Sequence, residues 1–128
     1  PRAAEMDRAV EQKWPQVIWI VRHGQSAGNV ARDAAEAAGA AIIDLAHRDV
    51  DVPLSALGER QATALGEWFG RMPPEERPTV VLCSPYVRAR ETARLIARAA
   101  TLDEDAEPVA DERLREKEFG ILDRLTVH

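Results

Sequence analysis

The apolar residues of this chain form two patterns, short continuous runs and stretches that repeat every three or four positions. Residues 16–21 read QVIWIV, and a β-branched and aromatic run of this kind is typical of a strand buried on both faces. Residues 79–82 form a second such run, and we assign a third strand to residues 107–110, where the pattern is weaker. The sequence therefore predicts three short strands.

Three other stretches predict helices. Residues 30–41 are rich in alanine, which favours a helix. Ser55 is the expected N-cap of a second helix, which a proline pair at positions 73–74 ends. Ser84 and Pro85 are the expected N-cap and first residue of a third helix. The apolar positions of the second and third helices recur at steps of three and four residues and are Ala62, Leu65, Phe69, Met72, Ala89, Ala93, Ile96 and Ala100.

Strands that alternate with helices indicate an α/β domain with a mainly parallel sheet and helices on both faces. The length of 128 residues suits one domain, because domains usually have about 100–200 residues. Residues 1–15 are charged and rich in alanine, and we assign them to an N-terminal extension. Residues 16–128 form the domain, in which the connection 42–53 carries no predicted element.

Composition narrows the class of protein. The chain is 45% hydrophobic and 30% charged, so it can bury a core. A net charge of -5 and a pI of about 5.2 argue against a nucleic-acid partner. No apolar run approaches the roughly 20 residues that a membrane span needs, and no signal peptide is recognisable. The single cysteine, Cys83, forms no internal disulfide, which favours a cytoplasmic location.

Two predicted strand ends carry candidate chemistry. Arg22 and His23 follow the first predicted strand. Cys83 follows the second predicted strand, and Arg88 comes one helical turn later. Ligands of parallel sheets bind beyond the carboxyl ends of the strands. Arginine binds phosphate through a planar set of donors, and histidine attacks phosphorus when its free nitrogen is unprotonated and its other nitrogen has an acceptor. The pattern is typical of an anion site that contains a nucleophile. Taken alone, an Arg-His-Gly tripeptide is more often a surface turn, so the two interpretations stay open at this point.

Cys83 is the rival nucleophile. Cysteine phosphatases need five residues between cysteine and arginine, whereas four separate Cys83 from Arg88 and six separate it from Arg90. Neither spacing fits, so we expect Cys83 to be a buried strand-end residue.

Four blocks, in order, resemble the signature of the histidine phosphatase superfamily, which includes the cofactor-dependent phosphoglycerate mutases. Residues 22–29 read RHGQSAGN and residues 53–62 read PLSALGERQA. Residues 84–93 read SPYVRARETA and residues 114–120 read LREKEFG. The resemblance covers roughly residues 17–122 and implies a phosphoglycerate mutase-like fold.

The resemblance also implies catalytic roles. His23 would become the phosphohistidine, and Arg22 and Arg88 would clamp the phosphoryl oxygens and stabilise the charge of the transition state. Glu116 would be the general acid that protonates the leaving oxygen and then the base that activates water. The alternating charges around Glu116 are also typical of an exposed segment, and Glu118 is the rival carboxylate.

Two further residues are implied for binding. Asn29 would help to bind the phosphate or the substrate, and Ser26 is a further candidate donor. Gly58 and Gln61 are interpreted as structural residues at a helix start.

The sequence departs from the family in one catalytic residue. Relatives use a second histidine, on a later strand end and followed by glycine, opposite Arg22 and Arg88. His128 comes too early for this role and His47 lies in the wrong order. We therefore expect the chain to be incomplete, either truncated or lacking a C-terminal part, with activity belonging to the intact protein.

Three positions bear on the choice between phosphatase and mutase. Mutases of the family have tryptophan at the position of Gly28, a Thr-Gly-Trp loop in the region of residues 42–53 and tyrosine at the position of Phe119. All three are absent, which favours phosphomonoester hydrolysis. Mutase-type phosphoryl transfer and a non-catalytic phosphate-binding module are the alternatives.

We expect no metal and no cofactor, because arginines take the place of a cation and no cluster of residues has metal-ligand spacing. The expected partner is a small phosphorylated metabolite, with no membrane and no nucleic acid. The substrate and the oligomeric state are left open by the sequence.

Overall fold

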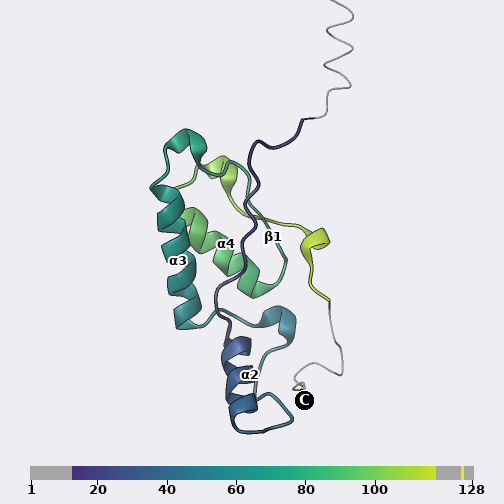
Figure 1. The fold of residues 1–128 in the computed structure, drawn as a ribbon. Helices are drawn as coiled ribbons and strands as arrows, with labels where there is room; N and C mark the ends of the chain where they lie inside the picture. Colours follow the sequence, from purple (N-terminus) through teal and green to yellow (C-terminus); the bar gives the residue numbers. More distant parts are fainter. Residues whose placement is uncertain (1–12, 118–124, 126–128) are drawn as a thin grey trace, which may run out of the picture.

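The structure is a computed structural model that describes residues 13–117 and residue 125 (Figure 1). Its helices are α2 (Ala27–Ala37), α3 (Ala56–Gly70) and α4 (Val87–Ala99). Its strands are β1 (Leu82–Cys83) and β2 (Val109–Ala110). Short 3-10 turns η1 to η4 lie at Asp49–Asp51, Pro74–Glu76, Glu104–Ala106 and Glu112–Leu114.

The core lies between α3 and α4, which run side by side. Its buried residues are Ala62, Phe69, Ile96 and Ala100, with Leu65, Met72, Leu95 and Leu102 packed around them. The helices approach closely at Gly66, where a Cβ atom would lie 2.7 Å from both the Cβ of Ala99 and the carbonyl oxygen of Ile96. The apolar stripe expected on the second predicted helix is thereby confirmed as a contact surface, together with Ile96 and Ala100 of the third. Ala89 and Ala93, also predicted in the third stripe, are not part of this cluster.

The α/β class is confirmed by the path of the chain from β1 through α4 to β2. The two strands are parallel, with Leu82 opposite Val109 and Cys83 opposite Ala110. Parallel neighbours need a crossover connection, which α4 provides. The carboxyl end of β1 therefore points toward the start of α4, which carries Arg88.

The expectation of a buried strand over residues 16–21 is wrong for the described structure. The segment forms no strand, and the side chains of Ile18 and Ile20 are 71% and 95% exposed. A strand needs a neighbour to accept and donate its backbone hydrogen bonds, and residues 16–21 make no ladder with other described residues. Trp19 is anchored by edge-to-face contacts with Trp68 and Phe69 at centroid distances of 5.6 and 5.3 Å.

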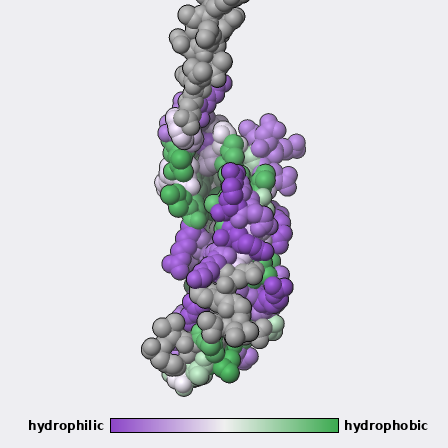
Figure 2. Space-filling model, turned by 90° about the vertical axis from the view of Figure 1, so that its right-hand side faces the viewer, coloured by the Kyte–Doolittle hydropathy of each residue, from purple (hydrophilic) through white to green (hydrophobic). Residues whose placement is uncertain are grey.

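The predicted second strand is shorter and less buried than expected. The ladder begins at Leu82 rather than at residue 79, and Val80 and Leu82 are 71% and 52% exposed. Val109, the register partner of Leu82, is also exposed. Figure 2 shows exposed apolar side chains as green patches in the upper half of the molecule, above a belt of hydrophilic residues.

The helix starts follow the capping residues. Ser55 caps α3 as predicted, since its Oγ accepts a hydrogen bond from the amide of Gly58 at 3.1 Å. The first helix begins at residue 27 rather than 30, because Ser26 is its N-cap. For α4 the expected cap was wrong: Tyr86 is the N-cap, and Ser84 Oγ accepts a hydrogen bond from the Tyr86 amide at 3.2 Å.

Several predictions lie outside the described residues, namely those on residues 1–12, on Glu118, Phe119 and Gly120, and on His128. Within the described part of the chain, no helix is long and apolar enough to cross a membrane.

Candidate active site

His23 lies at the end of the extended N-terminal segment, just before α2. Its Nδ1 atom lies 2.6 Å from the carbonyl oxygen of Gly24. A carbonyl oxygen only accepts hydrogen bonds, so Nδ1 is the donor and carries the proton. In the neutral ring the lone pair is then on Nε2. The backbone thus provides the acceptor that the nucleophile was expected to need.

The loop that carries His23 is held from both helices of the core. The amide of Gly24 donates to Thr92 Oγ1 of α4 at 3.2 Å, and that hydroxyl donates to the carbonyl of Arg88 at 2.7 Å. The amide of Gln25 donates to Gln61 Oε1 of α3 at 2.8 Å. A side chain at Gly24 would overlap the backbone of Gly58, so the close approach requires glycine.

A cavity of about 210 Å³ opens beside this loop. Its lining residues are Arg22, His23, Gly24, Gln61, Ala62, Leu65 and Thr92. Arg22 is exposed and makes no ion pair with the other described residues. The structure therefore brings Arg22, a candidate phosphate clamp, and His23, the candidate nucleophile, to the same cavity. The positive charge of Arg22 is available there to an anion.

Arg88 lies outside the lining of this cavity and is engaged by two carboxylates. Its residue is 6% exposed, and Nη2 donates to Glu116 Oε2 at 2.8 Å. Nη1 donates to the carbonyl oxygen of Asp49 at 2.7 Å and to its Oδ1 atom at 3.1 Å. Arg88 and Glu116, both predicted from the sequence, are thus in direct contact, and Asp49 of η1 joins them.

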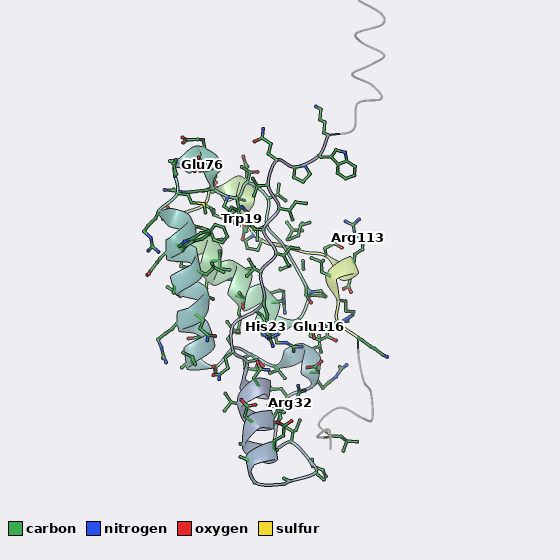
Figure 3. The ribbon with its side chains drawn as sticks, in the orientation of Figure 1. Trp19, His23, Arg32, Glu76, Arg113 and Glu116 are labelled. Carbon is green, nitrogen blue, oxygen red and sulfur yellow. The ribbon has the colours of Figure 1, made fainter. Side chains whose placement is uncertain are left out.

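In Figure 3, His23 lies at the end of the extended N-terminal segment and Glu116 in the segment that follows η4. A chain of hydrogen bonds connects their surroundings, from Gly24 to Thr92, from Thr92 to Arg88 and from Arg88 to Glu116. The candidate nucleophile and the candidate acid are therefore anchored to the same N-terminal half of α4.

Tyr86 supports the pair of Arg88 and Glu116. Its side chain is completely buried, and its hydroxyl donates to the backbone carbonyl of Glu116 at 3.2 Å. The guanidinium of Arg88 lies over its ring at 4.9 Å from the centroid, and that of Arg115 at 5.6 Å. A cation over an aromatic face is held by the ring quadrupole.

Ser26 and Asn29 are brought together, but as a helix cap. Asn29 Oδ1 accepts from the amide and the hydroxyl of Ser26 at 2.9 and 3.0 Å, and Ser26 Oγ accepts from the amide of Asn29 at 3.1 Å. The Ser26 hydroxyl proton is therefore occupied. The Asn29 side-chain amide nitrogen takes no part in this capping box.

Cys83 is a buried residue of β1, as expected. Its Sγ atom lies 3.7 Å from the carbonyl oxygen of Val109. Burial raises the pKa of the Cys83 thiol, and the positive charges of Arg90 and Arg94 oppose this effect only in part. The thiolate is the nucleophilic form of cysteine, so this environment disfavours a catalytic role.

Sequence reasoning missed three residues of the site, namely Asp49, Tyr86 and Thr92. Asp49 gave no signal, because it lies in the connection to which no element was assigned. Tyr86 and Thr92 lie in the third family block, where a buried aromatic residue and a hydroxyl close to Arg88 were available as clues. Among the described residues, no group of three or more histidine, cysteine, aspartate or glutamate side chains is placed to hold a metal ion.

The histidine phosphatase superfamily (branch 1) matches residues 18–128, and the chain belongs to this family. Fructose-2,6-bisphosphatase TIGAR of Xenopus laevis is 35% identical over 103 residues, which are 80% of this chain and 32% of the relative. Probable phosphoglycerate mutase GpmB of Klebsiella pneumoniae is 32% identical over 107 residues, which are 84% of this chain and 40% of the relative.

A solved structure named Mycobacterial hydrolase 1 is also similar, with a TM-score of 0.56 and 30% identity. The match covers 82% of this chain and 40% of that chain. The chain thus spans between 32% and 40% of the length of these relatives. The names of the two relatives describe a phosphatase and a mutase, so they share phosphoryl transfer as a reaction class.

Proposed function

We propose that the intact protein hydrolyses phosphomonoesters of small metabolites through a phosphohistidine on His23. The observation that carries this proposal is the hydrogen bond from His23 Nδ1 to Gly24, which leaves the Nε2 lone pair beside a cavity lined by Arg22. Family membership supports the same reaction class.

In the first step, Nε2 of His23 attacks phosphorus and the bond between phosphorus and the leaving oxygen breaks. Glu116 gives its proton to that oxygen, so the product leaves as an alcohol. Arg22 and Arg88 stabilise the charge on the phosphoryl oxygens. While Glu116 carries its proton, Arg88 is paired with the Asp49 carboxylate alone. More of the positive charge of Arg88 is then available to the phosphoryl group.

In the second step, water attacks the phosphorus of the phosphohistidine and the bond from Nε2 to phosphorus breaks. Glu116, now a carboxylate, takes the proton from this water. The products are inorganic phosphate and free His23. The Asn29 amide nitrogen, which the capping box leaves unused, is the additional donor in this scheme, and Ser26 holds Asn29 in place.

Mutase-type transfer is the second candidate, because one relative is named as a probable phosphoglycerate mutase. The surroundings of Gly28 favour hydrolysis instead. A Cβ atom at Gly28 would lie 3.3 Å from Cγ1 of Val52, and Val52 is 1% exposed. A side chain as large as tryptophan at this position would have to enter the space that Val52 and Leu45 border. A non-catalytic module is the third candidate and has no structural observation in its favour.

We expect hydrolysis to exceed transfer. Incubation of the intact protein with 3-phosphoglycerate, with and without 2,3-bisphosphoglycerate, should yield little 2-phosphoglycerate, while p-nitrophenyl phosphate is hydrolysed. Product analysis by ³¹P NMR measures both reactions in one tube. Efficient interconversion stimulated by the bisphosphate would make the mutase the correct choice, and inactivity in both assays would favour the non-catalytic module.

We also expect activity without a metal ion, because Arg22 and Arg88 provide the positive charge in this mechanism. Dialysis against EDTA should leave the rate of p-nitrophenyl phosphate hydrolysis unchanged. A loss that magnesium or zinc restores would assign the protein to a different class of phosphatase.

A cytoplasmic location is part of the proposal and is supported by the single, buried thiol of Cys83.

A further inference from the structure

Two carboxylates contact the guanidinium of Arg88. Its single positive charge faces the carboxylates of Asp49 and Glu116, at 3.1 and 2.8 Å. Three of its five N–H donors are engaged by the carbonyl of Asp49, the carboxylate of Asp49 and the carboxylate of Glu116. A phosphoryl group that approaches Arg88 therefore meets two negative charges next to the cation.

The carboxylates of Asp49 and Glu116 differ in the negative charge that they place beside Arg88 during the reaction. In the proposed mechanism Glu116 carries a proton when the substrate reacts, so its charge is then absent. Asp49 transfers no proton in this mechanism, and its side chain remains beside Arg88. The Asp49 side chain is 32% exposed and that of Arg88 is 7% exposed, so solvent screens their interaction only in part.

The Asp49 carboxylate is not needed to place the guanidinium. The backbone carbonyl of Asp49 already accepts from Nη1 at the shorter distance of 2.7 Å. The Tyr86 ring faces the guanidinium, whose Cζ atom lies 4.9 Å from the ring centroid. The backbone and the aromatic ring position Arg88, and the carboxylate adds a negative charge.

We propose that Asp49 is a resident counter-ion of Arg88 that weakens the hold of the site on phosphate. This inference rests on the proposed function, in which Arg88 binds the phosphoryl group. A phosphate that binds through Nη1 must share this group with Oδ1 of Asp49 or displace the carboxylate. A phosphate that binds through the other N–H donors of Arg88 still meets the negative charge of Asp49 next to the cation. The consequence is faster release of inorganic phosphate, the product that every turnover leaves in the site.

The test is direct binding of inorganic phosphate to the intact protein, measured by isothermal titration calorimetry. Asp49→Asn keeps the size of the side chain and an oxygen that accepts from Nη1, but removes the charge. We expect its dissociation constant for phosphate to fall by about three- to tenfold, where tenfold corresponds to about 1.4 kcal/mol. Damage to the fold would weaken binding, so a gain in affinity separates this role from a structural one.

Asp51→Asn is the matched control. Asp51 lies in the same turn η1, its side chain is exposed, and it makes no ion pair with the described residues. We expect its phosphate affinity to stay within about twofold of the wild type. An equal gain in both variants would reveal a general charge effect, and an unchanged or weaker affinity in Asp49→Asn would overturn the inference.

A third variant separates this inference from the proposed function. Arg88→Gln should lower phosphate affinity at least about tenfold, since hydrogen bonds to charged groups are strong. Wild-type affinity in this variant would overturn both the phosphate-binding role of Arg88 and the inference about Asp49. If Asp49→Asn fails to fold, Asp49→Ala keeps the backbone carbonyl and carries the same expectation.

Discussion

Replacing His23 with alanine is expected to abolish turnover of p-nitrophenyl phosphate in the intact protein. The substitution removes the atom that forms the bond to phosphorus, and losses on the order of 10⁴–10⁶-fold are typical when a nucleophile is removed. The fold should persist, because His23 is only partly buried and its ring bonds to the carbonyl of the next residue. Arg88 and Gly24 keep their hydrogen bonds to other residues.

Two measurements make this prediction specific. Incubation with ³²P-labelled substrate and rapid acid-free quenching should label the wild-type protein and leave His23→Ala unlabelled. Circular dichroism should show the same helix content in both. His47→Ala, which changes an exposed histidine in the connection before α3, should keep full activity and labelling. Turnover of His23→Ala within a few-fold of the wild type would remove His23 from the mechanism.

Replacing Glu116 with glutamine is expected to slow the reaction of an alkyl phosphate far more than that of p-nitrophenyl phosphate. An alkoxide leaves poorly unless it is protonated as the bond to phosphorus breaks, whereas nitrophenolate needs much less help. General acid assistance is worth about 10²–10⁴-fold, so the difference between the two substrates should be large. The glutamine oxygen can still accept from Arg88 Nη2, which keeps the packing of the site.

Phosphorylation of the protein must be measured by rapid quench, because dephosphorylation also needs a base and would mask the first step. Glu118→Gln is the control for the rival carboxylate, and we expect little effect from it on either substrate. Equal losses for both substrates in Glu116→Gln, or a larger loss in Glu118→Gln, would assign the acid elsewhere.

The second experiment also bears on the geometry of Arg88. If Glu116 only positioned Arg88, its replacement by glutamine would affect both substrates alike, because the phosphoryl group is the same in each. A loss that depends on the leaving group identifies proton transfer. The pair of predictions therefore distinguishes the atom that attacks phosphorus from the group that protonates the product.

The sequence by itself determined the family, the class of fold and the identity of the candidate nucleophile. Motif blocks are local, so Arg22 and His23 were recognisable from their neighbours. Helices were predicted well for the same reason: the Ser55 cap and the stripe through Phe69 depend on residues a few positions apart.

Only the tertiary structure decided which groups surround Arg88 and which apolar residues are buried. Asp49 and Glu116 are 39 and 28 residues from Arg88 in the chain, and no local pattern relates them. The apolar run at 16–21 has strong strand propensity, yet Ile20 is 95% exposed, because a strand forms only where a partner edge completes its hydrogen bonds. Contacts between distant segments set the charge around Arg88 and the length of the strands, and such contacts depend on the folded chain.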